Sequence, residues 1–172
     1  GTGTFTNNGI ADITGGTLSG KVFNNSAAAT ANVSNLTLNG GAQFSNAGLV
    51  NAQANGNGFQ TSAGPIIVSN AATGTFRRFT GVGTYQMTGV TFNNSGRVSV
   101  ESGTLQTSRL VAPAVPAQYS QTGAGALTEV VGGAAIATDL PLAIQGGTLG
   151  GAGTINSVVP GGGVNNSGGI MR

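Results

Sequence analysis

Few side chains of this 172-residue protein could take part in acid–base, nucleophilic or metal chemistry. The sequence has no Cys and no His, so its many serines lack a Ser–His partner, and Lys21 lies in no nucleophile motif. No Asp-rich calcium loop is present. The carboxylates are dispersed along the chain, at Asp12, Glu101, Glu129 and Asp139. We therefore expect no catalytic residue, no metal and no cofactor.

An aromatic and basic cluster is the most conspicuous local motif of the chain. It consists of Phe76, Arg77, Arg78 and Phe79. These four residues could bind a sugar or an anion through stacking and charge. The alternative, which we favour, is one strand with inward phenylalanines and outward arginines. The other basic residues are scattered and the net charge is only +2, so we expect no nucleic acid partner.

Repeated segments indicate how these residues are positioned. Residues 4–18 align without a gap with residues 91–105, at an offset of 87. Each copy has a phenylalanine, an Asn, Ser and Gly cluster typical of a turn, and alternating apolar residues that end in Gly-Thr-Leu. The second half of the unit returns at 144–149, 44 residues after its earlier copy. This spacing predicts coils of about 22 residues.

The composition favours short strands over helices. Gly accounts for 32 residues and interrupts almost every helical window. Only 6% of residues are charged, but 38% are hydrophobic, which is typical of a folded chain. The best helical segment, 132–140, ends at a proline, and we predict a loop or strand there.

A fixed repeat period favours a solenoid over a β-sandwich, because stacked coils bring equivalent positions together. We predict an all-β fold, a single parallel β-helix (β-solenoid) with about 20–22 residues per coil and roughly eight coils. One domain would span 1–172 as a segment of a longer repeat array, with 109–143 as a less regular coil or loop excursion. In such a stack Asp12 and Glu101 would lie four coils apart, about 20 Å. That separation is too large for a paired mechanism, and we predict that the protein is not an enzyme.

Stacking also predicts columns of like side chains along the solenoid. The aromatic column would contain Phe5, Phe23, Phe44 and Phe92. The leucine column would contain Leu18, Leu105 and Leu149. The asparagine column would contain Asn7, Asn25, Asn46 and Asn94.

The repeats resemble those of secreted bacterial β-helix proteins, namely autotransporter passengers and filamentous-haemagglutinin-like adhesins. Residues 92–105 look like the repeat that these proteins share, and 147–156 followed by 164–170 look like their Gly-x-Gly-Thr-Ile coil. The resemblance covers about two thirds of the chain. It implies a right-handed coil, secretion to the bacterial cell surface, and a structural or adhesive role.

The expected partners follow from this resemblance, from the unpaired edge that an exposed end coil would have, and from the low charge of the chain. They are a second copy, bound end to end or laterally, or a host or matrix surface. No apolar run approaches the roughly 20 residues of a membrane helix, so we expect no membrane insertion of this segment. The alternative function is a carbohydrate-binding or carbohydrate-degrading β-helix, similar to phage tailspikes, with glycans as partners.

Overall fold

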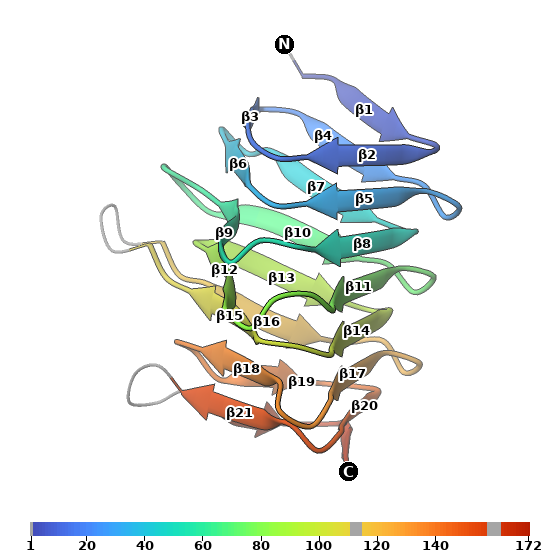
Figure 1. The fold of residues 1–172 in the computed structure, drawn as a ribbon, viewed down its shortest axis with the longest axis vertical. Coiled ribbons are helices and arrows are strands. Elements are labelled where there is room, and N and C mark those ends of the chain that lie inside the picture. The colour runs from blue at the N-terminus through green and yellow to red at the C-terminus, as the bar shows by residue number, and fades with distance from the viewer. Residues whose placement is uncertain (1, 111–114, 158–162) are drawn as a thin grey trace.

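Short runs of alternating side chains, each followed by a polar or glycine-containing corner, fold into 23 strands and no helix in the described part of the chain. The computed structural model describes residues 2–110, 115–157 and 163–172. The strands stack in coils along the long axis of the molecule, with the two termini at opposite ends (Figure 1). Each coil contributes one strand to each of three parallel sheets, which we name A, B and C.

The sheets contain strands from every third position in the chain order. Sheet A contains β1 (Thr4–Asn7), β4 (Val22–Asn25), β7 (Gln43–Asn46), β10 (Ile66–Asn70), β13 (Val90–Asn94), β16 (Gln118–Gln121), β19 (Leu142–Ile144) and β22 (Val164–Asn166). Sheet B contains β2 (Ile10–Ile13), β5 (Thr30–Val33), β8 (Leu49–Ala52), β11 (Thr75–Arg78), β14 (Arg97–Val100), β17 (Leu127–Val130), β20 (Thr148–Gly150) and β23 (Ile170–Met171). Sheet C contains β3 (Thr17–Ser19), β6 (Leu36–Asn39), β9 (Gly56–Gln60), β12 (Thr84–Thr88), β15 (Thr104–Ser108), β18 (Ala135–Thr138) and β21 (Thr154–Ser157).

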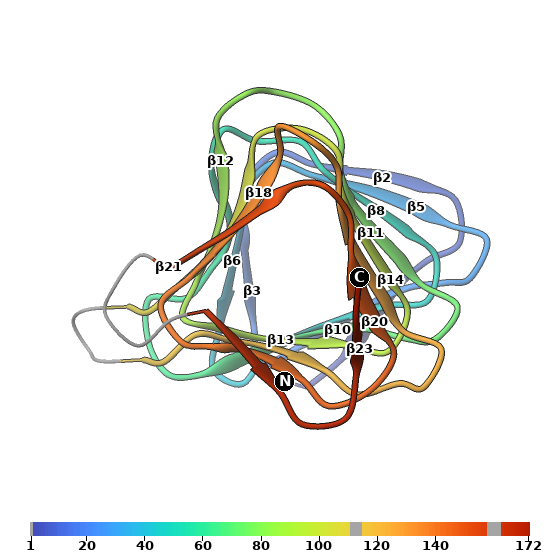
Figure 2. The same ribbon diagram turned by 90° about the horizontal axis from the view of Figure 1, so that it is seen from below.

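The three sheets form a roughly triangular prism around the core (Figure 2). In this view from the C-terminal end, the chain turns counterclockwise from sheet A through B to C as it approaches the viewer, which makes the coil right-handed. The predicted β-solenoid is therefore confirmed. The strands make seven complete turns and begin an eighth, because sheet C has seven strands and the other sheets have eight.

Coil length is less regular than the expected 20–22 residues. Successive members of the asparagine column lie 18, 21, 24, 24 and 27 residues apart. The strands vary only between two and five residues, so the corners absorb most of the difference. The corner from sheet C to sheet A has only two residues between β3 and β4, and nine between β15 and β16. The offset of 87 corresponds to four coils, as the register from Phe5 to Phe92 shows.

The region 109–143 is mostly regular. It contains β16, β17 and β18 and the beginning of β19, all in parallel register with their neighbours. The excursion is confined to the start of the region, where Leu110 and Val115 form an antiparallel bridge, while 111–114 lie outside the described residues. Within the segment 132–140 the chain forms strand β18.

The predicted leucine column does not form. Leu18 and Leu105 both lie in sheet C, on β3 and β15, but the register through β6, β9 and β12 places them four positions apart. Leu149 lies in sheet B, on β20, opposite Thr128. Gly16, Gly103 and Gly147 all have positive φ at the same place in the motif. The Gly-Thr-Leu motif therefore specifies a corner followed by a strand, and it occurs at two different corners of the triangle.

Candidate functional site

The most extended side-chain arrangement is the asparagine column at the corner between sheets A and B. Asn7 donates to Asn25, Asn25 to Asn46, Asn46 to Asn70 and Asn70 to Asn94, with Nδ2 to Oδ1 distances of 2.8, 2.8, 2.7 and 2.9 Å. Each Nδ2 also donates to a backbone carbonyl of the next coil, at the first residue of a sheet B strand. The column therefore joins successive coils through side chains as well as backbone.

The sequence at this corner explains why asparagine is suited to it. A short amide side chain can accept from a backbone amide two residues later and so close the turn. The Asn46 Oδ1 accepts in this way from the Gly48 amide at 3.2 Å. A Cβ at Gly48 would lie 2.2 Å from the Ser26 carbonyl oxygen, so the close approach of the two coils requires glycine there.

The asparagine column ends in a buried polar cluster. Asn94 donates to Gln121 Oε1 at 3.2 Å, and Gln121 Nε2 donates to the Gly146 carbonyl at 2.8 Å. The Thr128 hydroxyl donates to the same Gln121 oxygen and is hydrogen-bonded to the Tyr119 hydroxyl. Burial raises the pKa of Tyr119 well above its usual range. Ile144 follows in the column, opposite Gln121, and has no polar side chain to continue it.

Two members of the column, Asn70 and Gln121, were not identified from the sequence. All four repeat units that indicate the column begin with phenylalanine, whereas Asn70 follows Val68 and Gln121 follows Tyr119 by two residues. A pattern of one apolar residue, one polar residue and one amide would have found them.

The aromatic column lies on the inner face of sheet A and has the predicted phenylalanines in one column. Phe5, Phe23 and Phe44 are in direct register, and Val68 separates Phe44 from Phe92. The rings of Phe23 and Phe44 stack with centroids 5.0 Å apart and an interplanar angle of 9°. Aromatics from the other sheets, Phe59, Phe76 and Tyr85, continue the packing to Phe92.

The structure does not bring residues 76–79 together as a surface patch. Phe76 and Arg78 point inward and are 0% exposed, whereas Arg77 points outward. Arg77 lies over the partly exposed Phe79 ring, with its Cζ 4.6 Å from the centroid. Only Arg77 and Phe79 can therefore meet a ligand. The expectation of inward phenylalanines and outward arginines is therefore wrong for Phe79 and for Arg78.

Arg78 is a buried cation held by neutral groups. Its guanidinium donates to Asn55 Oδ1 at 2.8 Å and to the carbonyls of Gly83 and Ala52 at 3.0 and 3.2 Å. Burial lowers the pKa of Arg78 and raises that of Tyr85, because it disfavours both charged forms. The arginine joins two successive coils at the corner between sheets B and C.

The four carboxylates are engaged separately. Asp12 accepts from Asn32 Nδ2 at 2.6 Å, and Asp139 accepts from the Arg109 amide at 2.8 Å. Glu129 pairs with Arg97 at 2.6 Å on the outer face of sheet B. The acids do not converge on one cleft.

The best-defined ion pair on the surface is Arg77–Glu101. Two hydrogen bonds of 2.7 Å join the guanidinium to the carboxylate. The hydrogen bond to Arg77 lowers the pKa of Glu101, and the same bond raises the pKa of Arg77. The Ser99 hydroxyl also donates to Glu101, at 2.9 Å. This geometry holds the charges in place and leaves the carboxylate poorly suited to proton transfer near neutral pH.

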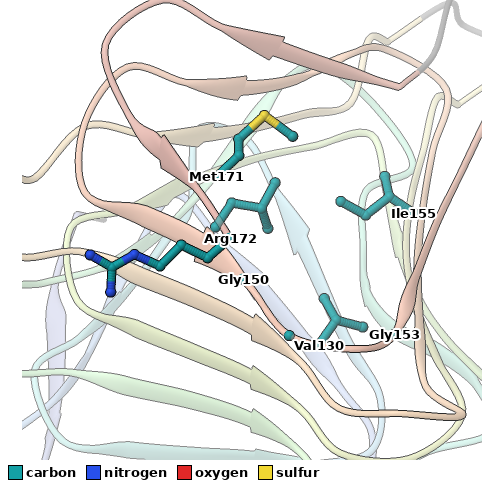
Figure 3. Close-up of a pocket in the computed structure, with 8 residues that line it drawn as sticks. Val130, Gly150, Gly153, Ile155, Met171 and Arg172 are labelled. Carbon is teal, nitrogen blue, oxygen red and sulfur yellow. The ribbon is translucent and has the colours of Figure 1, made fainter.

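The open C-terminal end contains a cavity of about 290 Å³. Its lining is apolar or glycine except for Arg172, and includes Val130, Leu149, Ile155 and Met171. Ile155 and Met171 lie at the hollow, and the Arg172 guanidinium points away from it (Figure 3). The cavity offers apolar contact and no acid–base side chain.

Within residues 2–110, 115–157 and 163–172, no group of three or more Asp, Glu, His or Cys side chains could hold a metal ion. The same residues include no helix that is long and apolar enough to cross a membrane. Comparison of the chain with known family models, with curated proteins and with solved structures finds no match.

Proposed function

We propose that this chain is a stiff structural element of a secreted bacterial surface protein or fibre, of the adhesin or autotransporter-passenger kind. The asparagine column carries this proposal, since it runs through six consecutive coils from Asn7 to Gln121. Buried networks in which the polar atoms satisfy one another resist deformation, because bending the stack would break several bonds at once. The resemblance of the repeats supports secretion and surface display.

The placement of the charged residues supports a role without catalysis. The hydrogen bonds and ion pairs of the four acids serve to fix neighbouring strands or corners. The cavity at the C-terminal end has no carboxylate in its lining. Such fixed contacts suit a structural element, which needs stacked coils and no reactive group.

Single-molecule stretching tests the mechanical part of this proposal. Because the chain has no Cys, one cysteine added near each end gives a unique pair of attachment points. We expect the chain to resist force and then extend in steps of whole coils, roughly 65–95 Å each for 18 to 27 residues. Smooth extension at low force, with no steps, would contradict a stiff element.

Two further experiments test the location and the alternative function. An antibody against the chain should label intact cells of the source organism, and labelling only after permeabilisation would contradict surface display. The chain should leave a glycan array unlabelled and release no reducing sugar. Specific glycan binding lost in an Arg77→Ala variant would instead favour the carbohydrate-binding β-helix.

A further inference from the structure

We propose that Asn55 is a modification site, where the side-chain amide is hydrolysed to a carboxylate without a second protein and the product pairs with the buried Arg78. The reaction is intramolecular. The backbone nitrogen of Gly56 attacks the Asn55 side chain, and water then opens the cyclic imide. This inference does not depend on the proposed structural role, and it adds a link between two coils that forms after folding.

A buried cation without a counter-charge carries this inference. Arg78 is 0% exposed, and its hydrogen-bond acceptors are Asn55 Oδ1 and two backbone carbonyls, all of them neutral. Its Nε is buried and has no hydrogen-bond partner among the described residues. The two ion pairs in that part of the chain involve other arginines. Because a buried charge among neutral groups is costly, a carboxylate beside Arg78 would be favoured.

The sequence at Asn55 favours cyclisation. Asparagine is chemically labile because the backbone nitrogen of the next residue can attack its side-chain carbonyl, and a side chain on that next residue hinders the attack. Residue 56 is a glycine with a φ of 126°, a conformation that other residues rarely adopt. Asn55 is exposed and lies just before β9, so water can reach it.

Arg78 is placed to promote the attack. Its guanidinium donates to Asn55 Oδ1 at 2.8 Å. When the Gly56 nitrogen bonds to Cγ, negative charge develops on this oxygen, and a donor already aimed at the oxygen stabilises that charge. Glycines make room for the contact, since a Cβ at Gly81 would lie 2.5 Å from Asn55 Oδ1 and one at Gly83 would lie 3.0 Å from Asn55 Cγ.

The reaction balances as the hydrolysis of one amide. In the first step, the bond between the Gly56 nitrogen and Asn55 Cγ forms, the Cγ–Nδ2 bond breaks, and the Gly56 nitrogen gives its proton to the departing ammonia. In the second step, a water oxygen bonds to Cγ, the bond from Cγ to the Gly56 nitrogen breaks, and that nitrogen regains a proton from the water. The products are an aspartate side chain at residue 55 and an ammonium ion.

The same hydrogen bond directs the second step. Attack of water at Cγ gives aspartate, whereas attack at the backbone carbonyl of the imide gives isoaspartate, which lengthens the main chain. Arg78 donates to the oxygen on Cγ and polarises that carbonyl, so we expect aspartate. A hydrogen bond between two charged groups is roughly twice as strong as one between neutral groups, so the product joins the two coils more firmly.

The chain contains matched controls for this reaction. Asn39 and Asn57 are also followed by glycine. The Asn39 Oδ1 accepts from the amide and the hydroxyl of Ser62 at 3.0 and 3.1 Å, and both donors are neutral. Asn57 is exposed and lies within β9. Neither asparagine is an acceptor of Arg78.

Incubation of the freshly purified chain at neutral pH tests the proposal, with digestion and fragmentation by mass spectrometry to assign each site. In the folded chain, we expect the Asn55 amide to be lost at least about tenfold faster than those of Asn39 and Asn57, with aspartate as the main product. In concentrated urea the three rates should become similar, because Arg78 no longer contacts Asn55. Similar rates in the folded chain, or a faster loss at Asn55 that persists in urea, would overturn the inference.

Variants separate the two roles of Arg78. Asn55→Asp supplies the product directly and should raise the melting temperature by about 2–4 °C, whereas Asn57→Asp should leave it nearly unchanged. Arg78→Gln removes the charge and should slow the loss of the Asn55 amide to the rate at Asn57, with circular dichroism as the check on folding. A lower melting temperature for Asn55→Asp, or an unchanged rate in folded Arg78→Gln, would contradict the proposal. If Arg78→Gln does not fold, the rates of the unaltered chain with and without urea decide the question.

Discussion

Asn46 lies in the middle of the asparagine column, and its replacement by alanine tests whether the column stabilises the stack. The side chain is 1% exposed. It donates to Asn70 at 2.7 Å and accepts from Asn25 at 2.8 Å. It also accepts from the Gly48 amide at 3.2 Å. An alanine here removes the side-chain bonds to Asn25 and Asn70, the bond to the Thr75 carbonyl of the next coil, and the bond that closes the turn.

The expected loss follows from these contacts. A hydrogen bond contributes about 1 kcal/mol net, and a buried polar group left without its partner costs about 1–3 kcal/mol. The Asn25 amide nitrogen keeps the Leu49 carbonyl as a partner, which limits the damage on that side, whereas the Asn70 Oδ1 loses the donor that Asn46 supplies. We expect Asn46→Ala to lower the free energy of unfolding by about 2–4 kcal/mol.

Denaturant titration followed by far-UV circular dichroism measures this change. Asn7→Ala is the matched control within the column, because this half-exposed residue has a side-chain partner on one side alone, and we expect about 1 kcal/mol. Ser45→Ala, on the outer face beside Asn46, should change stability by less than about 0.5 kcal/mol. A loss for Asn46→Ala no larger than that for Ser45→Ala would refute the stabilising role of the column.

Three further predictions concern other parts of the stack. Gly58→Ala should lower stability by about 1–3 kcal/mol in thermal melts, because its Cβ would lie 2.0 Å from the buried Tyr85 ring, and an unchanged melting temperature would contradict this packing. Tyr85 and Tyr119 are the only tyrosines, and burial raises the pKa of both. The contribution of these neutral, buried side chains to stability is complete below pH about 10. It is lost above that pH, since the tyrosines of the unfolded chain ionise first. Absorbance at 295 nm should therefore show both tyrosines ionising together with unfolding, and earlier ionisation of either would show that it is accessible. The pKa of Glu101 is lower in the folded chain than its unfolded value of 4.5, so the ionised side chain stabilises the fold above pH 4.5. This contribution to stability is lost as the pH falls below that value. Glu101→Gln should remove this part of the acid sensitivity, by at most about 1 kcal/mol because the pair with Arg77 is partly exposed, and an unchanged acid titration would count against the pair.

The fold and its aromatic and asparagine columns could be predicted because the sequence repeats at positions that meet in the stack. Phe5, Phe23, Phe44 and Phe92 occupy one inner column, and an asparagine follows two residues later in each of these coils. Such repetition has a direct physical cause, because identical side chains stack favourably and each asparagine can serve its neighbours as donor and acceptor.

Other features could not be predicted from a local pattern. Leu149 follows the same Gly-Thr motif as Leu18, but the motif specifies a turn and carries no information on which corner is being turned. Arg78 was expected outside because arginine is almost never buried alone. Its burial depends on Asn55, Ala52 and Gly83, which come from neighbouring corners and meet only in the folded stack.

The distance between Asn24 and Asn165 tests most directly whether the coils form a rigid stack in register. Both residues lie on the outer face of sheet A, in one column and six strands apart. In this Cys-free chain, cysteines at the two positions can carry spin labels without interference. Pulsed electron paramagnetic resonance at low protein concentration should show one narrow peak near ~29 Å between the labelled positions, broadened slightly by the linkers. A broad distribution, or a main distance far from this value, would contradict the stacked solenoid.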